Sequence, residues 1–118
     1  MIEGLKTLLE YFRDERHRRE DKADAALAAI YAAANETKLY IRKAQRTGRS
    51  EGKKEEELSR LWTAAAVPIR HFDRDLADRC LMKGRYWVDP ASWSVEDIVR
   101  FRIGIDEVFE EARELLQK

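Results

Sequence analysis

Apolar side chains recur every three or four residues along most of this chain, which is the spacing of one face of an α-helix. A segment from Ala23 to Ala34 is apolar almost all round, so we expect it to be buried on more than one side. The pattern predicts helices at about residues 2–18 and 22–47. The stripe of the first helix consists of Ile2, Leu5, Leu8, Leu9 and Phe12.

Residues 13–22 separate these two segments and are all charged or histidine. Two interpretations remain open. Either the chain folds back near residues 20–24, or residues 2–47 form one long helix. In the second case the stripe from Leu5 to Phe12 would need a partner chain. We favour the fold-back, because it lets one chain bury its own apolar stripe.

Two further helices are expected after a loop at residues 47–52. One spans about residues 54–82, with an inward stripe from Leu58 to Leu76 and a kink at Pro68. The other follows Ser94, whose spacing to Asp97 resembles a capping box. Short loops favour antiparallel neighbours. We therefore expect an all-α, up-down antiparallel four-helix bundle with the Ala-rich second helix at its centre, in one domain covering residues 1–118.

Composition narrows the class of protein. Charged residues make up 39% of the chain, which suits helices with solvated outer faces. Lys plus Arg equals Asp plus Glu at 23 each, whereas a dedicated duplex-binding domain usually carries a basic excess. No apolar run approaches the roughly 20 residues needed to cross a bilayer, and the start of the chain lacks a signal-peptide pattern. We expect a cytoplasmic protein without membrane contact.

The sequence offers no constellation that indicates catalysis. Neither His17 nor His71 has a Glu three positions before it, as carboxylate-bridged metal sites in bundles require. The single cysteine, Cys80, gives no zinc pattern and no intrachain disulfide. It lies at the edge of the helical stripe and is predicted to be a small buried hydrophobe. We expect no metal and no cofactor, and we favour a non-enzymatic protein.

One end of the expected bundle collects cations and indoles. The stripe of residues 58–76 continues as Arg79 and Lys83, and an aromatic turn at residues 83–94 follows. Guanidinium groups bind carboxylate or phosphate, and indoles can form walls. We interpret this end as a candidate pocket for an anionic ligand or a peptide. Its residues are Arg16, Arg19, Arg79, Lys83, Arg85, Trp87 and Trp93.

The alternative is a structural role for the same residues. Arg79 would then pair with Asp75 one turn earlier, and Trp87 and Trp93 would cover the core. The acidic residues of the last helix, Glu107 and Glu111 among them, are assigned mostly to its outer face.

Two other surfaces remain. Residues 38–54 carry seven cations and only Glu51 as an acid. We interpret them as charges that oppose helix dipoles, with weak nucleic-acid binding as an alternative. Val99 and Ile103 point away from the stripe of the last helix and are candidates for a homodimer contact. The favoured function is a protein-interaction or regulatory module, and the first alternative is a sensor or enzyme for a small anionic ligand.

Overall fold

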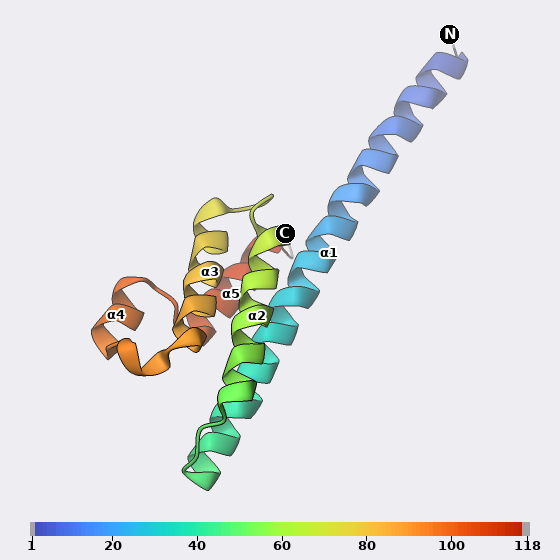
Figure 1. The fold of residues 1–118 in the computed structure, drawn as a ribbon. Coiled ribbons are helices and arrows are strands. Elements are labelled where there is room, and N and C mark those ends of the chain that lie inside the picture. The colour runs from blue at the N-terminus through green and yellow to red at the C-terminus, as the bar shows by residue number, and fades with distance from the viewer. Residues whose placement is uncertain (1, 117–118) are drawn as a thin grey trace.

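The computed structural model describes residues 2–116, and the side chains of residues 7–11 and 13–116. The predicted all-α bundle is confirmed: α2 packs between α1 and α3, and α5 packs against α1 and α3 (Figure 1). Among these residues we find no helix with the length and apolarity that a bilayer crossing requires. The elements are α1 (Ile2–Thr47), α2 (Gly52–Ile69), α3 (Arg74–Val88), the 3₁₀ turn η1 (Pro90–Ser92), α4 (Val95–Arg100) and α5 (Ile105–Leu116).

The first two predicted helices are a single helix, α1, so the favoured fold-back near residues 20–24 is wrong. The charged segment contains neither Gly nor Pro. It is stabilised by pairs one turn apart, such as Arg18 with Glu15 at 3.1 Å. The amino-terminal half of α1 therefore projects from the bundle as a rod, and the molecule measures 69 × 25 × 19 Å (Figure 1). The stripe side chains of Ile2, Leu5 and Phe12 lie outside the described residues.

The predicted helix 54–82 is also divided, because the chain reverses at residues 70–73 and α3 returns along α2 (Figure 1). Pro68 lies near the end of α2, where it interrupts the backbone hydrogen bonds. The side chain of Asp73 then accepts a hydrogen bond from the Leu76 amide at 3.1 Å and caps the new helix. The kink expected at Pro68 is thus a complete turn between two antiparallel helices.

Gly84 allows α2 and α3 to approach closely. A Cβ atom added at Gly84 would overlap the Thr63 hydroxyl and lie 3.1 Å from the Ser59 carbonyl oxygen. Any larger side chain would therefore push the two helices apart. The sequence placed Gly84 in an aromatic turn, whereas α3 continues through it to Val88.

The core is enclosed by α2, α3, α5 and the carboxyl-terminal half of α1. On α1 the buried positions follow the expected spacing: Ala26, Ile30, Ala33, Thr37 and Tyr40. Trp62 of α2 is fully buried and donates its indole N–H to Thr37 Oγ1 at 2.8 Å. The Ala-rich segment thus lies in the body of the bundle, as predicted.

The last predicted helix is split into α4 and α5. Ser94 and Asp97 form the predicted capping box: the Ser94 amide donates to Asp97 Oδ2 at 3.1 Å, and the Asp97 amide donates to Ser94 Oγ at 3.0 Å. The helix ends at Arg100, and Arg102 adopts a left-handed backbone with φ of 56°. This turn directs Ile103 into the core, where it is fully buried, while Val99 is 70% exposed. Because Ile103 is buried, the predicted homodimer contact through Val99 and Ile103 does not exist as a surface.

Candidate functional site

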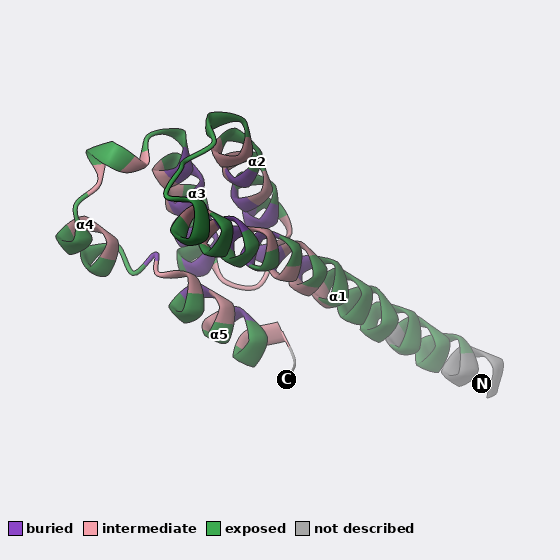
Figure 2. Cartoon of the chain, turned by 90° about the horizontal axis from the view of Figure 1, so that it is seen from below, coloured by how far each residue is buried: buried purple, intermediate pink, exposed green. Residues whose placement is uncertain are grey.

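The amino-terminal half of α1 presents apolar side chains to solvent. We call residues 7–22 the projecting segment. Every described side chain in it is exposed (Figure 2). Leu8, Leu9 and Tyr11 are 51%, 58% and 55% exposed. Single exposed apolar residues are ordinary on protein surfaces, but here they lie on a helix that no other part of the described chain covers.

The projecting segment continues the stripe that α1 buries in the body. Leu8, Arg16 and Arg19 each lie eighteen residues, or five complete helical turns, before Ala26, Ala34 and Thr37, which are buried. On a straight helix they therefore point in the same directions as these buried side chains. The body covers it from Ala26 onward and leaves it open before Ala23. One helix face therefore serves as core at one end and as free surface at the other.

Grooves flank α1 at the point where it leaves the body. One groove, of about 590 Å³, includes Arg19, His71 and Phe72 in its lining. Another, of about 430 Å³, includes Arg16, Arg19, Phe72 and Leu115. Among the described residues neither Arg16 nor Arg19 has an ion-pair partner. The grooves thus combine apolar rings and chains with two available guanidinium groups.

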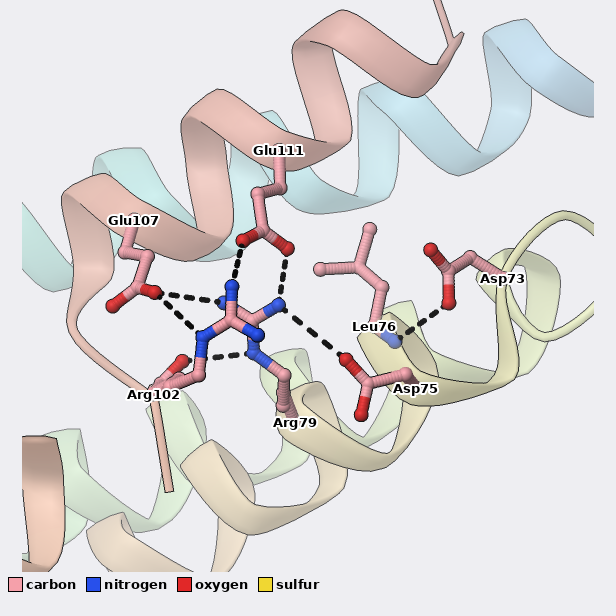
Figure 3. Close-up of polar contacts among 7 residues, drawn as sticks. All are labelled: Asp73, Asp75, Leu76, Arg79, Arg102, Glu107 and Glu111. Atoms are coloured by element: carbon pink, nitrogen blue, oxygen red, sulfur yellow. Dashed lines mark hydrogen bonds and ion pairs between the residues drawn. The ribbon is translucent and has the colours of Figure 1, made fainter. Parts of the chain in front are cut away.

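Arg79 is buried and neutralised within its own chain (Figure 3). Its Nε donates to the carbonyl oxygen of Arg102 at 2.9 Å. Its guanidinium pairs with Glu111 and lies 3.7 Å from the carboxylates of Asp75 and Glu107. A buried cation requires such acids. With three carboxylates supplied by α3 and α5, Arg79 gives no reason to expect an anionic ligand.

Two of these acids, Glu107 and Glu111, were missed by the sequence analysis. They are four residues apart and so share one face of α5. The same carboxylates also pair with Arg102, at 2.9 Å from Glu107 and 2.5 Å from Glu111. A search for acids that could neutralise a cation at the Arg79 position of the stripe would have identified this pair.

Lys83 lies one turn beyond Arg79 and is 6% exposed. Its Nζ is 5.2 Å from the centre of the Tyr86 ring and 6.0 Å from that of Trp62. Among the described residues it has no carboxylate partner. Burial lowers the pKa of the Lys83 amine to about 8, because the charged form is desolvated. The aromatic rings offset part of this cost by cation–π attraction.

The tryptophans of the predicted pocket have packing roles. Trp87 is 5% exposed and meets the Tyr40 ring edge-on at 5.6 Å, and its indole N–H has no acceptor among the described residues. Trp93 is partly buried and packs against Tyr86 at 6.0 Å and Phe101 at 5.8 Å. These rings connect the α4 segment to the bundle.

The structure does not bring the seven predicted site residues together. Arg16 and Arg19 lie beside Phe72, at the turn between α2 and α3. Trp87 lies beside Tyr40, near the α1–α2 loop at the opposite end of the body. The pocket required residues 2–47 to fold back, and the continuous α1 separates its members. Arg79 and Lys83 are buried between the two ends, Arg85 is exposed, and Trp93 follows η1.

The cations of residues 38–54 are partly neutralised. Lys38 pairs with Asp106 at 3.1 Å, and Lys43 pairs with Glu51 at 3.0 Å. Lys54 donates to Glu36 at 2.7 Å, and this bond raises the Lys54 pKa. These pairs weaken the argument for a nucleic-acid surface on this loop.

The described residues also provide no metal-binding group of three or more His, Cys, Asp or Glu side chains. Cys80 is fully buried, as predicted, and burial raises its pKa to about 12, so its thiol is protonated at neutral pH. Comparison of the chain with protein-family models, with curated proteins and with solved structures finds no match. The candidate site therefore rests on the geometry of α1 and of the grooves beside it.

Proposed function

We propose that this protein is a non-enzymatic interaction module that binds a helical protein partner through the projecting segment of α1. The observation that carries the proposal is the continuity of one helix face. Residues 26–40 use it to pack against the body, while Leu8, Arg16 and Arg19 present it to solvent. Packing of an apolar stripe against another helix is how such faces are normally satisfied.

Helix stability gives a second reason for a partner. An isolated helical segment of about 12–15 residues is only marginally stable in water, since most helical stability comes from tertiary packing. The projecting segment has no tertiary packing in the described chain beyond its junction with the body. A partner helix would supply that packing and would cover Leu8 and Leu9.

The first alternative function, a site for a small anionic ligand, receives less support. An anionic ligand at the basic-aromatic end would need available cations there, but Arg79 is already paired with acids of the chain. Lys83 is buried beneath aromatic rings.

Site-specific crosslinking tests the proposal in full-length protein. A photoreactive amino acid replaces Leu8 in one variant and Leu39 in the other, since both leucines lie on α1 and are 51% and 55% exposed. In native cells we expect a discrete adduct from position 8 and none from position 39. Leu9→Glu should remove the adduct. Absence of an adduct at position 8, or equal adducts at both positions, would contradict the proposal.

A further inference from the structure

We propose that the helical partner of the projecting segment is acidic: it sets carboxylates against Arg16 and Arg19 and apolar side chains in the groove beside Phe72. This inference rests on the proposed function and specifies the chemistry of the partner. It is carried by three features: the cations at the base of the projecting segment, the direction in which two of them point, and the apolar lining of the groove between them.

Cations without a partner gather where α1 leaves the body. A third groove, of about 560 Å³, shares His71 with the 590 Å³ groove. Together the three grooves include five cations that have no ion-pair partner among the described residues: Arg16, Arg19, Lys22, Arg70 and Arg74. Only three acids line the same grooves, and one of them, Glu15, is already paired with Arg18. This surface is therefore basic although the whole chain has a formal net charge of zero, and it is complementary to an anionic partner.

Arg16 and Arg19 point to the side of α1 on which the partner would lie. They share the directions of the buried side chains of Ala34 and Thr37, five turns later. A helix packed along this face would meet Leu8 first and the two guanidinium groups about 12–17 Å farther along. Two carboxylates one turn apart on the partner would face both groups, and such charge-assisted hydrogen bonds are roughly twice as strong as neutral ones.

The groove at this point also has an apolar surface. The turn between α2 and α3 supplies Phe72, and the carboxyl end of α5 supplies Leu115 and Leu116 (Figure 1). All three side chains are half-buried, so they still have apolar area to lose to a partner. Apolar anchors of an amphipathic helix would fill the groove, while the facing charges decide which helix is accepted.

A protein helix fits this surface better than a nucleic acid does. The phosphates of a nucleic acid follow one another at every step and are best matched by a continuous cationic track, but Glu15, Glu20 and Asp78 interrupt the cations of the grooves. Unpaired bases stack on exposed aromatic rings. Among the described residues that line the grooves, the only phenyl or indole ring is that of half-buried Phe72.

Binding of defined helical peptides to the full-length protein tests the inference. The peptides are stapled so that they are helical before binding. They share one apolar stripe and differ only at two positions one turn apart, which are both Glu, both Gln or both Lys. Fluorescence anisotropy measures the affinities. We expect the Glu peptide to bind at least about tenfold more tightly than the Lys peptide, with the Gln peptide between them.

Charge reversal identifies the side chains that select the peptide. In the double variant Arg16→Glu/Arg19→Glu the order should invert, so that the Lys peptide binds best, and in Arg16→Gln/Arg19→Gln the preference should disappear. The matched control Arg42→Glu/Arg46→Glu makes the same change in net charge at exposed positions near the other end of α1 and should keep the original order. Circular dichroism checks that each variant remains folded.

Every other result overturns the inference. Affinities that do not depend on the two varied positions, a preference of the natural chain for the Lys peptide, or no binding of any peptide would exclude an acidic partner. A single-stranded oligonucleotide that binds more tightly than the Glu peptide, and is released by Arg16→Glu/Arg19→Glu, would identify a nucleic-acid surface instead. A crosslinked adduct at position 8 that persists in that double variant would preserve the proposed function without an acidic partner, whereas no adduct in the natural chain would remove both.

Discussion

Trp62 and Thr37 form a fully buried polar link between α2 and α1, with the indole nitrogen 2.8 Å from the threonine oxygen. Thr37 in turn donates to the carbonyl of Ala33 at 2.7 Å. Both polar groups of this link are satisfied without water. The indole N–H has no substitute acceptor in an apolar core, so loss of the threonine oxygen leaves it unpaired.

Thr37→Val should therefore lower the free energy of unfolding by about 1–3 kcal/mol, because it keeps the side-chain shape but removes the acceptor. The measurement is urea unfolding followed by tryptophan fluorescence. Thr47→Val is the matched control, since Thr47 makes the same type of bond to a carbonyl four residues earlier but is exposed. Its effect should stay within about 0.5 kcal/mol. Equal effects of the two substitutions would contradict the argument.

Gly84→Ala should destabilise the protein although alanine is the better helix former by about 1 kcal/mol. The added methyl would overlap Thr63 and press on the Ser59 carbonyl, so α2 and α3 must separate. Overpacking of this kind costs about 1–3 kcal/mol, and we expect a net loss measured by thermal unfolding. Gly52→Ala, which meets no atom within 4 Å, is the control and should leave the melting temperature nearly unchanged. A Gly84→Ala variant more stable than the natural chain would refute the close contact.

Glu111→Gln should cost about 1–3 kcal/mol, because it removes a charge that neutralises buried Arg79 and links α5 to α3. The comparison variant is Glu110→Gln, whose exposed pair with Arg113 is confined to α5 and should contribute less than about 0.5 kcal/mol. Chemical denaturation measures both. If the two variants are equally stable, Arg79 does not depend on Glu111.

Lys83 should make stability depend on pH in a defined direction. Its folded-state pKa of about 8 lies below its ordinary value of 10.5, so between these values the unfolded chain binds the extra proton. The Lys83 contribution is therefore unfavourable below pH 8 and is relieved as pH rises. The difference in unfolding free energy between the natural chain and Lys83→Met should shift in favour of the natural chain from pH 7.5 to about 9.5.

The raised pKa of Cys80 makes the free energy of unfolding fall above pH 9 in both proteins. This effect cancels when the free energy of the Lys83→Met variant is subtracted from that of the natural chain. A difference that stays constant with pH would mean that Lys83 remains fully charged in the fold.

The sequence predicted the packing faces better than it predicted where helices end. Ala26, Leu58, Trp62 and Leu76 are buried as the helical spacing indicated. That spacing does not depend on distant contacts. The reversal before Asp73 was missed because residues on either side of it share one helical phase. Only the pairing of α2 with α3 selects the turn over a kink.

The residues of the candidate site were also misplaced because the sequence does not fix where helices end. Residues 13–22 are compatible with either a turn or a helix, and the helix forms because nothing in them interrupts the backbone hydrogen bonds. The acids around Arg79 were misplaced because the last helix was taken as continuous. The left-handed residue Arg102 separates α5 from α4 and lets α5 lie with Glu107 and Glu111 toward Arg79.

The uninterrupted course of α1 has a mechanical consequence. Between residues 5 and 47 it contains no glycine or proline, so it has no built-in hinge. Leu9 and Ala33 are held about 36 Å apart along one hydrogen-bonded rod. A torque applied at the tip would therefore reach the core directly, and whatever binds there is held at a set spacing and orientation, unlike cargo on a flexible tether.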